Sequence, residues 1–139
     1  MKNTIINSTK KLFLFFTLAM IISISQSFAQ SEVKVLTPDK FEKLSKKGRK
    51  AVILDIRTPE EVAEGHIENA VFANYSGGNF EEALQSLDKK KTYYVYCRSA
   101  KRTVPATEKM KEMGFKKVYM LEGGLNNWIK SEKGITKAK

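Results

Sequence analysis

The sequence predicts a three-layer α/β domain with a mostly parallel sheet. Strand-like and helix-like segments alternate along the chain, which is typical of such folds. Residues 51–55 (AVILD) form a short, nearly continuous apolar run, the pattern of a strand that is buried on both faces. Ligands of these sheets bind at the carboxyl ends of the strands, so residues that directly follow a predicted strand are the first candidates for a functional site.

The first half of the predicted domain contains two helix-start signals. Thr37-Pro38 and Thr58-Pro59 each place a capping residue before a proline at the first helical position, and Gly65 ends the second of these helices. Strands are expected at residues 33–36, 51–55 and 70–72, and a further helix at residues 79–87.

The second half begins with residues 92–96 (TYYVY), whose aromatic and β-branched composition predicts a strand. Cys97 stands at its carboxyl end. Thr103 is expected to cap the next helix, which ends at Gly114, and residues 117–121 form the last expected strand. A closing helix follows Gly123-Gly124, and residues 135–139 are expected to fray.

The first 29 residues have the three parts of a secretory signal peptide. Lys2, Lys10 and Lys11 precede residues 12–24, which are uncharged and almost entirely apolar, and small residues occur near Ala29. We therefore expect cleavage after Ala29, an exported chain (periplasmic or secreted), and a single domain over residues 30–139. A membrane anchor is the alternative. However, 13 apolar residues fall short of the ~20 that span a bilayer, so we expect no stable membrane insertion after cleavage.

Composition excludes several kinds of site. Residues 30–139 hold 22 Lys and Arg against 15 Asp and Glu, a net charge of +7. Because the lysines are scattered in pairs, we expect a solvated surface and no nucleic-acid partner. Cys97 is the single cysteine and His66 the single histidine, so we predict no disulfide, no metal and no cofactor. We interpret His66 as a structural residue, with a general base as the alternative.

Cys97 is the candidate nucleophile. It opens the segment Cys-Arg-Ser-Ala-Lys-Arg between a strand and a helix, where a tight curl points several backbone N–H groups into one concave spot. Together with the cations of Arg98, Lys101 and Arg102, this predicts a pKa below about 8.5 for the thiol and a cradle for a small anion. The alternative is an inert cysteine buried at the end of a core strand.

Two further groups stand at the same predicted edge. Asp55 and Arg57 follow another strand end, and we expect them to support the loop, with capping of the neighbouring helix as the alternative. Gly123-Gly124 are expected to provide backbone clearance beside the active edge, with a fragment of a phosphate-binding loop as the alternative.

Taken together, these motifs resemble the rhodanese-like family of sulfurtransferases. The matching segments are residues 55–61 (DIRTPEE), 64–67 (EGHI), 96–99 (YCRS) with Arg102, 114–115 (GF), and 121–124 (LEGG) with Trp128. They occur in the family's order and at about its spacing over residues 33–129. The resemblance implies a five-stranded, mostly parallel sheet with helices on both faces. It also implies that a loop cysteine takes sulfane sulfur from a small anionic donor such as thiosulfate, releases sulfite, and passes the sulfur to cyanide or a thiol.

Mapped onto this chain, the resemblance makes Cys97 the nucleophile and the sulfur carrier. The residues implied to bind the substrate and to cradle the persulfide are Arg98, Ser99, Ala100, Lys101, Arg102 and Thr103. Since the chain has no second cysteine, the acceptor must come from outside.

Two positions depart from the family's pattern. Ala100 stands where the family usually has Gly, and Thr103 where it usually has Ser. Ala tolerates positive φ less well than Gly, so a slightly distorted cradle and a lower turnover are expected.

The alternatives to a sulfurtransferase are a non-catalytic binding or sulfur-sensing module and a Cys-dependent phosphatase. Phosphatases of this kind place an arginine six positions after the cysteine, whereas Arg102 comes one position earlier.

Overall fold

The structure, a computed structural model, describes residues 32–137. The expected signal peptide, with its cleavage after Ala29, lies outside the described residues. The elements of the described part are β1 (Lys34–Leu36), α2 (Pro38–Ser45), β2 (Ala51–Asp55), α3 (Pro59–Glu64), β3 (Val71–Phe72), α4 (Phe80–Gln85), β4 (Thr92–Tyr96), α5 (Thr103–Glu112), β5 (Lys117–Leu121) and α6 (Gly124–Lys130). Between residues 32 and 137, no helix is both long and apolar enough to cross a bilayer.

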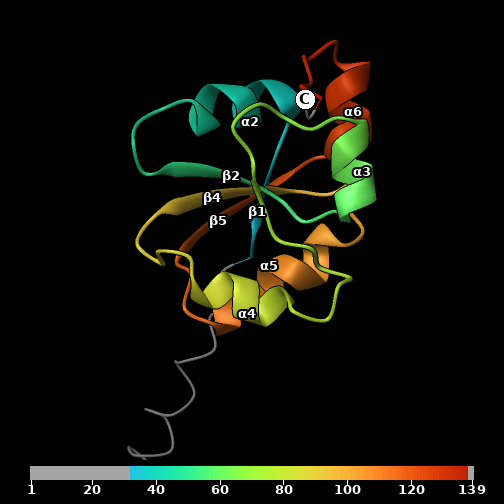
Figure 1. The fold of residues 1–139 in the computed structure, drawn as a ribbon. Helices are drawn as coiled ribbons and strands as arrows, with labels where there is room; N and C mark the ends of the chain where they lie inside the picture. Colours follow the sequence, from blue (N-terminus) through green and yellow to red (C-terminus); the bar gives the residue numbers. More distant parts are fainter. Residues whose placement is uncertain (1–31, 138–139) are drawn as a thin grey trace, which may run out of the picture. The chain divides into compact units, whose positions relative to one another are not determined.

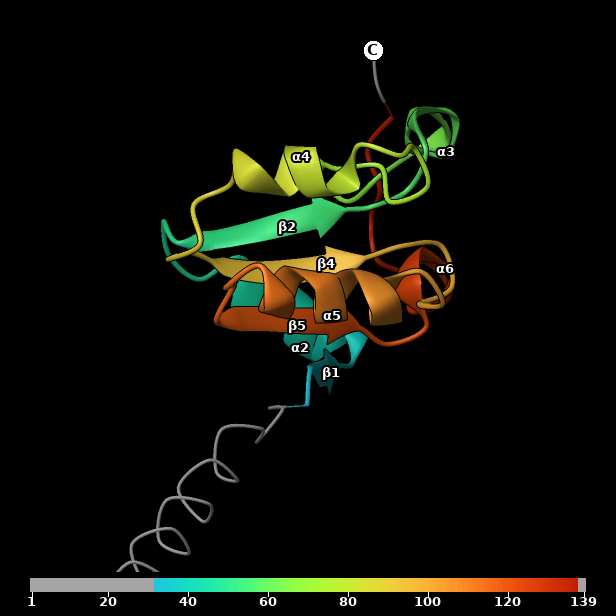
Figure 2. The same cartoon turned by 90° about the horizontal axis from the view of Figure 1, so that it is seen from below.

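The five strands form one sheet in the order β1-β5-β4-β2-β3, and every neighbouring pair is parallel. Helices α2 and α6 pack on one face, and α4 and α5 pack on the other (Figure 1). This confirms the predicted three-layer α/β fold. Because the strands are parallel, β2 and β4 point their carboxyl ends toward the same side of the domain, where α3 lies (Figure 2).

The central strand β4 is buried on both faces. Tyr93 and Val95 pack with the helices α4 and α5, while Tyr94 and Tyr96 pack on the side of α2 and α6. Cys97 continues the first of these faces and is 1% exposed. The apolar character of residues 92–96 therefore places the cysteine at the carboxyl end of the most enclosed strand.

The predicted helix starts are correct in position but differ in capping. Thr58 forms a complete capping box with Glu61, through bonds of 3.4 and 3.2 Å in the two directions. The Thr37 hydroxyl makes no capping bond. The prediction that Thr103 caps α5 is wrong, because Thr103 is the first residue of that helix. Its N–H already donates to the Ala100 carbonyl at 3.1 Å, so the turn of the loop starts the helix.

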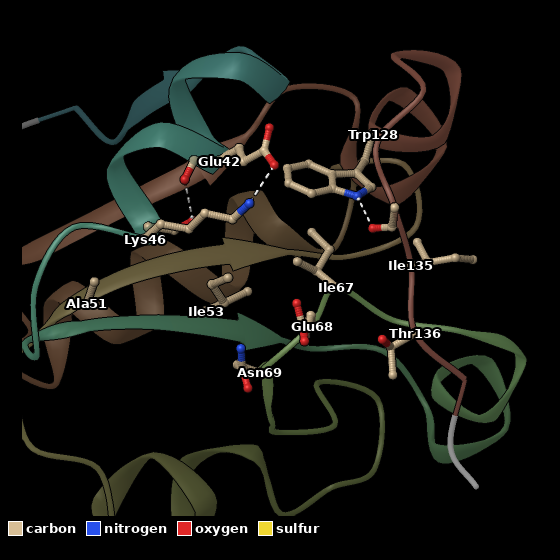
Figure 3. A pocket seen from close by; sticks show the side chains of 12 residues that line it. Glu42, Lys46, Ala51, Ile53, Ile67, Glu68, Asn69, Trp128, Ile135 and Thr136 are labelled. Carbon is tan, nitrogen blue, oxygen red and sulfur yellow. Dashed lines mark hydrogen bonds and ion pairs between the residues drawn. The ribbon is translucent and has the colours of Figure 1, made fainter.

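The C-terminal strap (residues 132–137) is ordered against the domain, so the expectation that fraying begins at residue 135 is wrong. His66 and Thr136 exchange two backbone hydrogen bonds of 2.8 Å. The Trp128 Nε1–H donates to the Gly134 carbonyl at 2.9 Å (Figure 3). Lys133 lies 2.7 Å from two carboxylates of α2. These contacts join the strap to α6, to α2 and to His66, two residues after the end of α3.

Candidate active site

The cysteine loop (residues 97–103) leads from the carboxyl end of β4 into α5. Ala100 turns the loop with a φ of 70°, in the left-handed region. A residue with a Cβ is strained there, since its Cβ approaches the following carbonyl oxygen. The backbone of this loop therefore has the form that favours glycine, and Ala100 adopts it at a cost.

Helix α6 holds the loop from outside. The N–H groups of Leu125 and Asn126 donate to the carbonyls of Cys97 and Arg98, at 2.8 and 3.0 Å. A Cβ on Gly124 would lie 2.5 Å from the Cys97 oxygen, so only glycine allows this approach. The expected backbone clearance is thus present at Gly124. It lets the two N–H groups of α6 bind two loop carbonyls, which therefore face α6 and not the sulfur.

The Cys97 sulfur lies among hydrogen-bond donors. Burial raises the pKa of the thiol, but the Thr103 hydroxyl and the backbone N–H groups of Ser99, Thr103 and Arg102 outweigh burial and bring the pKa below its ordinary value. Thr103 Oγ1 is fully buried and, among residues 32–137, has no hydrogen-bond partner of regular geometry. It therefore gains a partner when the thiol ionises. The sequence also predicted a lowered pKa for the Cys97 thiol, but the main cause of the lowering is this set of hydrogen-bond donors.

The arginines of the loop also pair with a carboxylate of α3, a contact that the sequence did not predict. Arg102 donates to both carboxylate oxygens of Glu61 at 2.7 and 2.8 Å, and Arg98 donates to the same carboxylate at 2.8 Å. The bonds from Arg102, and then the bond from Arg98, prevail over burial and hold the pKa of Glu61 far below its usual range. Arg102 also interacts with Cys97, whereas Arg98 turns to Glu61 and Glu64, and Lys101 is exposed. Glu61 therefore holds Arg102 beside the sulfur.

Glu61 is the site residue that the sequence motifs did not single out. Its place as the third residue of α3, in a capping box, is visible in the sequence as Thr-Pro-Glu-Glu. Its contacts with the cysteine loop join residues 37 and 41 positions apart, and no local pattern predicts them.

Asp55 and Arg57 form a buried ion pair beneath α3. The Arg57 Nη2 lies 2.7 Å from Asp55 Oδ2, and both side chains are almost inaccessible. The same guanidinium donates to the carbonyls of Glu61 and Gly65 at 2.9 and 2.7 Å. The pair thus holds the helix that presents Glu61 to the loop, so its contacts with the site run through α3.

His66 makes structural contacts. Besides the two bonds with the strap, its Nδ1 lies 3.0 Å from the Ile67 carbonyl, and its ring packs edge to face on Phe72 at 5.1 Å. These contacts fit the structural interpretation of His66.

Two hollows lie away from the cysteine loop. One, of about 560 Å³, lies between α2, β2 and the strap and includes Ile67 and Trp128 in its wall (Figure 3). The other, of about 720 Å³, lies between α4, α5 and the residues that precede α4. No residue of the cysteine loop lines either hollow, so neither of them is the cradle at Cys97.

Comparison with known proteins gives consistent matches. The model of the "Rhodanese-like domain" family matches residues 37–131. The "Putative sulfurtransferase YtwF" of Bacillus subtilis is 34% identical over 108 residues, which cover 78% of this chain and 98% of that protein. "Thiosulfate sulfurtransferase GlpE" of Coxiella burnetii is 35% identical over 82 residues, 59% of this chain and 75% of that protein.

A solved structure from Rhodopseudomonas palustris, described as a protein of unknown function and possible tyrosine phosphatase, is 27% identical with a TM-score of 0.67. The match covers 78% of this chain and 88% of that one. The family match extends from the residue before α2 to the residue after α6, and so includes the cysteine loop and the helix that carries Glu61. The chain belongs to the rhodanese-like family.

Proposed function

We propose that this chain is a sulfurtransferase that carries sulfane sulfur on Cys97. The observation that carries the proposal is the buried sulfur of Cys97, whose pKa is lowered by the hydroxyl of Thr103 and by loop N–H groups. These donors stabilise a thiolate, the form of cysteine that attacks sulfur. The sulfurtransferase names of the two relatives support the same chemistry.

The reaction balances with Cys97 alone. The thiolate attacks the outer sulfur of the donor, a new S–S bond forms, and the bond between the outer and central sulfurs of thiosulfate breaks, with its electron pair leaving on sulfite. The acceptor then attacks the terminal sulfur of the persulfide and returns Cys97 to the thiolate. The N–H groups of Ser99 and Arg102 and the hydroxyl of Thr103 are placed to stabilise negative charge on the sulfur at both stages.

We propose thiosulfate or a similar small sulfane anion as the donor, and an external thiol or cyanide as the acceptor. The support is the thiosulfate sulfurtransferase name of the Coxiella burnetii relative and the cationic loop, in which Arg102 interacts with the sulfur and Lys101 is exposed. Sulfite needs no protonation to leave, so this reaction requires no acid beside Cys97.

Intact mass after incubation with thiosulfate tests the proposal. The chain should gain one sulfur atom (about 32 Da), and cyanide should remove it and form thiocyanate. Cys97→Ser is the matched control, since a hydroxyl cannot form a persulfide, and it should stay unmodified. A wild-type chain that gains no sulfur, or gains it equally in Cys97→Ser, would contradict the proposal.

The two alternatives predict different results in the same assays. A non-catalytic module would bind sulfur or nothing and would not turn over thiosulfate with cyanide. A phosphatase would hydrolyse aryl phosphates through Cys97 and leave thiosulfate untouched. We expect no such hydrolysis, since the cysteine loop is one residue too short to place an arginine six positions after Cys97.

We further propose that the chain is exported. The support is the basic, then apolar, then small-residue pattern of residues 1–29. Sequencing the protein recovered from the cell envelope should find a first residue at or near Gln30. A soluble cytoplasmic chain that still begins at Met1 would contradict this proposal.

A further inference from the structure

Nine cations gather at the end of the sheet opposite to Cys97. They lie on the connections that precede β2, β4 and β5, with the last at the start of β5. Because these strands are parallel, their amino ends share one side of the domain, at the tails of the β2 and β4 arrows in Figure 2. The residues of this basic pole are Lys46, Lys47, Arg49, Lys50, Lys89, Lys90, Lys91, Lys116 and Lys117.

The three connections are joined to one another. The Thr92 N–H, at the start of β4, donates to the Lys50 carbonyl at 2.8 Å. Thr92 is also the register partner of Lys117 in β5. The Lys89 ammonium lies over the Phe115 ring, 5.9 Å from its centroid. Three basic runs that are about 25 to 70 residues apart in the sequence thus form a continuous surface.

Few acidic groups balance this surface. Within residues 32–137, Lys46 alone among the nine has an ion-pair partner, Glu42 at 2.7 Å. Asp88 is the single carboxylate on the three connections, and it accepts the backbone N–H of Lys90 at 2.9 Å. All nine cations except the half-buried Lys91 are exposed. The basic pole therefore has a strong positive potential that attracts an anionic partner.

We propose that the basic pole binds a membrane surface that carries anionic phospholipid headgroups. The support is charge complementarity, since eight of the nine cations are exposed and, within residues 32–137, Lys46 alone among them has an ion-pair partner. Bound in this way, the domain directs Cys97 away from the lipid and toward its soluble substrates.

The make-up of the basic pole favours headgroups over nucleic acid. Eight of the nine cations are lysines, which act as mobile point charges, whereas readers of nucleic acid rely on the planar arginine fork and on exposed aromatic rings. Phe115, the aromatic ring in contact with Lys89, is buried. A lysine near an anionic leaflet strengthens binding roughly fivefold, so several lysines suffice for reversible attachment.

Sedimentation with vesicles tests the proposal. Residues 30–139 contain both core clusters and are the form to use. This chain should sediment with vesicles that contain phosphatidylglycerol, stay in solution with pure phosphatidylcholine, and be released by high salt. The triple variant Lys47→Gln, Lys50→Gln, Lys90→Gln should bind the anionic vesicles about 100-fold more weakly, while its sulfur transfer is unchanged.

A second triple variant has the same net charge but leaves the basic pole intact. Lys40, Lys130 and Lys137 are exposed and follow the carboxyl ends of strands, so their replacement by Gln should change vesicle binding by less than about threefold. Equal losses in both variants, or equal binding to neutral and anionic vesicles, would overturn the proposal. Tighter binding of duplex DNA than of vesicles in the same buffer, lost in the first variant, would assign the pole to nucleic acid instead.

Discussion

Replacing Thr103 with Val should raise the pKa of the Cys97 thiol and slow its reactions near neutral pH. Val nearly matches Thr in shape but cannot donate a hydrogen bond, so burial, which raises the pKa, is opposed by the backbone N–H groups alone. A hydrogen bond to a charged group contributes about 1.5–3 kcal/mol, which corresponds to a roughly 10- to 100-fold lower thiolate-to-thiol ratio at any pH below the midpoint. The fold should persist, because the hydroxyl has no regular partner among the described residues.

The assay is the pH dependence of alkylation by iodoacetamide, followed by mass. Because Cys97 is only 1% exposed, the absolute rate reflects access as well as ionisation, and the midpoint is the quantity to compare. Thr103→Ser should keep a midpoint near that of the wild type. Thr107→Val is the matched control, since it removes another buried hydroxyl of α5, one that bonds to the Val104 carbonyl. A Thr103→Val midpoint equal to those of the wild type and Thr107→Val would refute the assigned role of Thr103.

Three further changes probe the support of the cysteine loop. Glu61→Gln should lower kcat/KM for thiosulfate several-fold. It should lower the free energy of unfolding by about 1 kcal/mol, because the bonds between Glu61 and Arg102 are only partly buried. Steady-state kinetics and urea unfolding measure the two effects, and unchanged kinetics would contradict a positioning role for Glu61. Ala100→Gly should raise the free energy of unfolding, measured with urea, by about 0.5–1 kcal/mol. The relief of strain at the positive φ outweighs the cost of the extra conformational entropy that glycine gives the unfolded chain. A destabilised variant would contradict the strain assigned to Ala100. Gly124→Ala should lower the free energy of unfolding by at least about 2 kcal/mol and remove most of the turnover, because the new Cβ would meet the backbone of the cysteine loop. Gly48→Ala is the control, since Gly48 has a positive φ but nothing within 4 Å of a Cβ built there. It should be destabilised less and keep its turnover.

Much of the fold and the centre of the site could be predicted because their signals are local. A capping residue followed by proline starts α3, and the aromatic and β-branched composition of residues 92–96 marks the strand β4. Parallel strands then place whatever follows β4 at the ligand-binding edge, which brings Cys97 and its loop there. The same locality explains the error at Thr103, where a threonine before a helix resembles a cap but its hydroxyl serves the sulfur.

The sequence by itself determined the three-layer fold and the position of Cys97, since each follows from neighbouring residues and strand burial. The left-handed backbone at Ala100 was expected only from the resemblance to the rhodanese-like family, which usually has Gly at this position. Only the tertiary structure decided which charges meet. Arg98 and Arg102 turn to Glu61, the strap pairs Thr136 with His66, and three separate lysine runs merge into the basic pole. Charged side chains on different elements carry no periodic signal of their partners. Their meeting depends on strand order and helix packing, which are settled when the whole core closes.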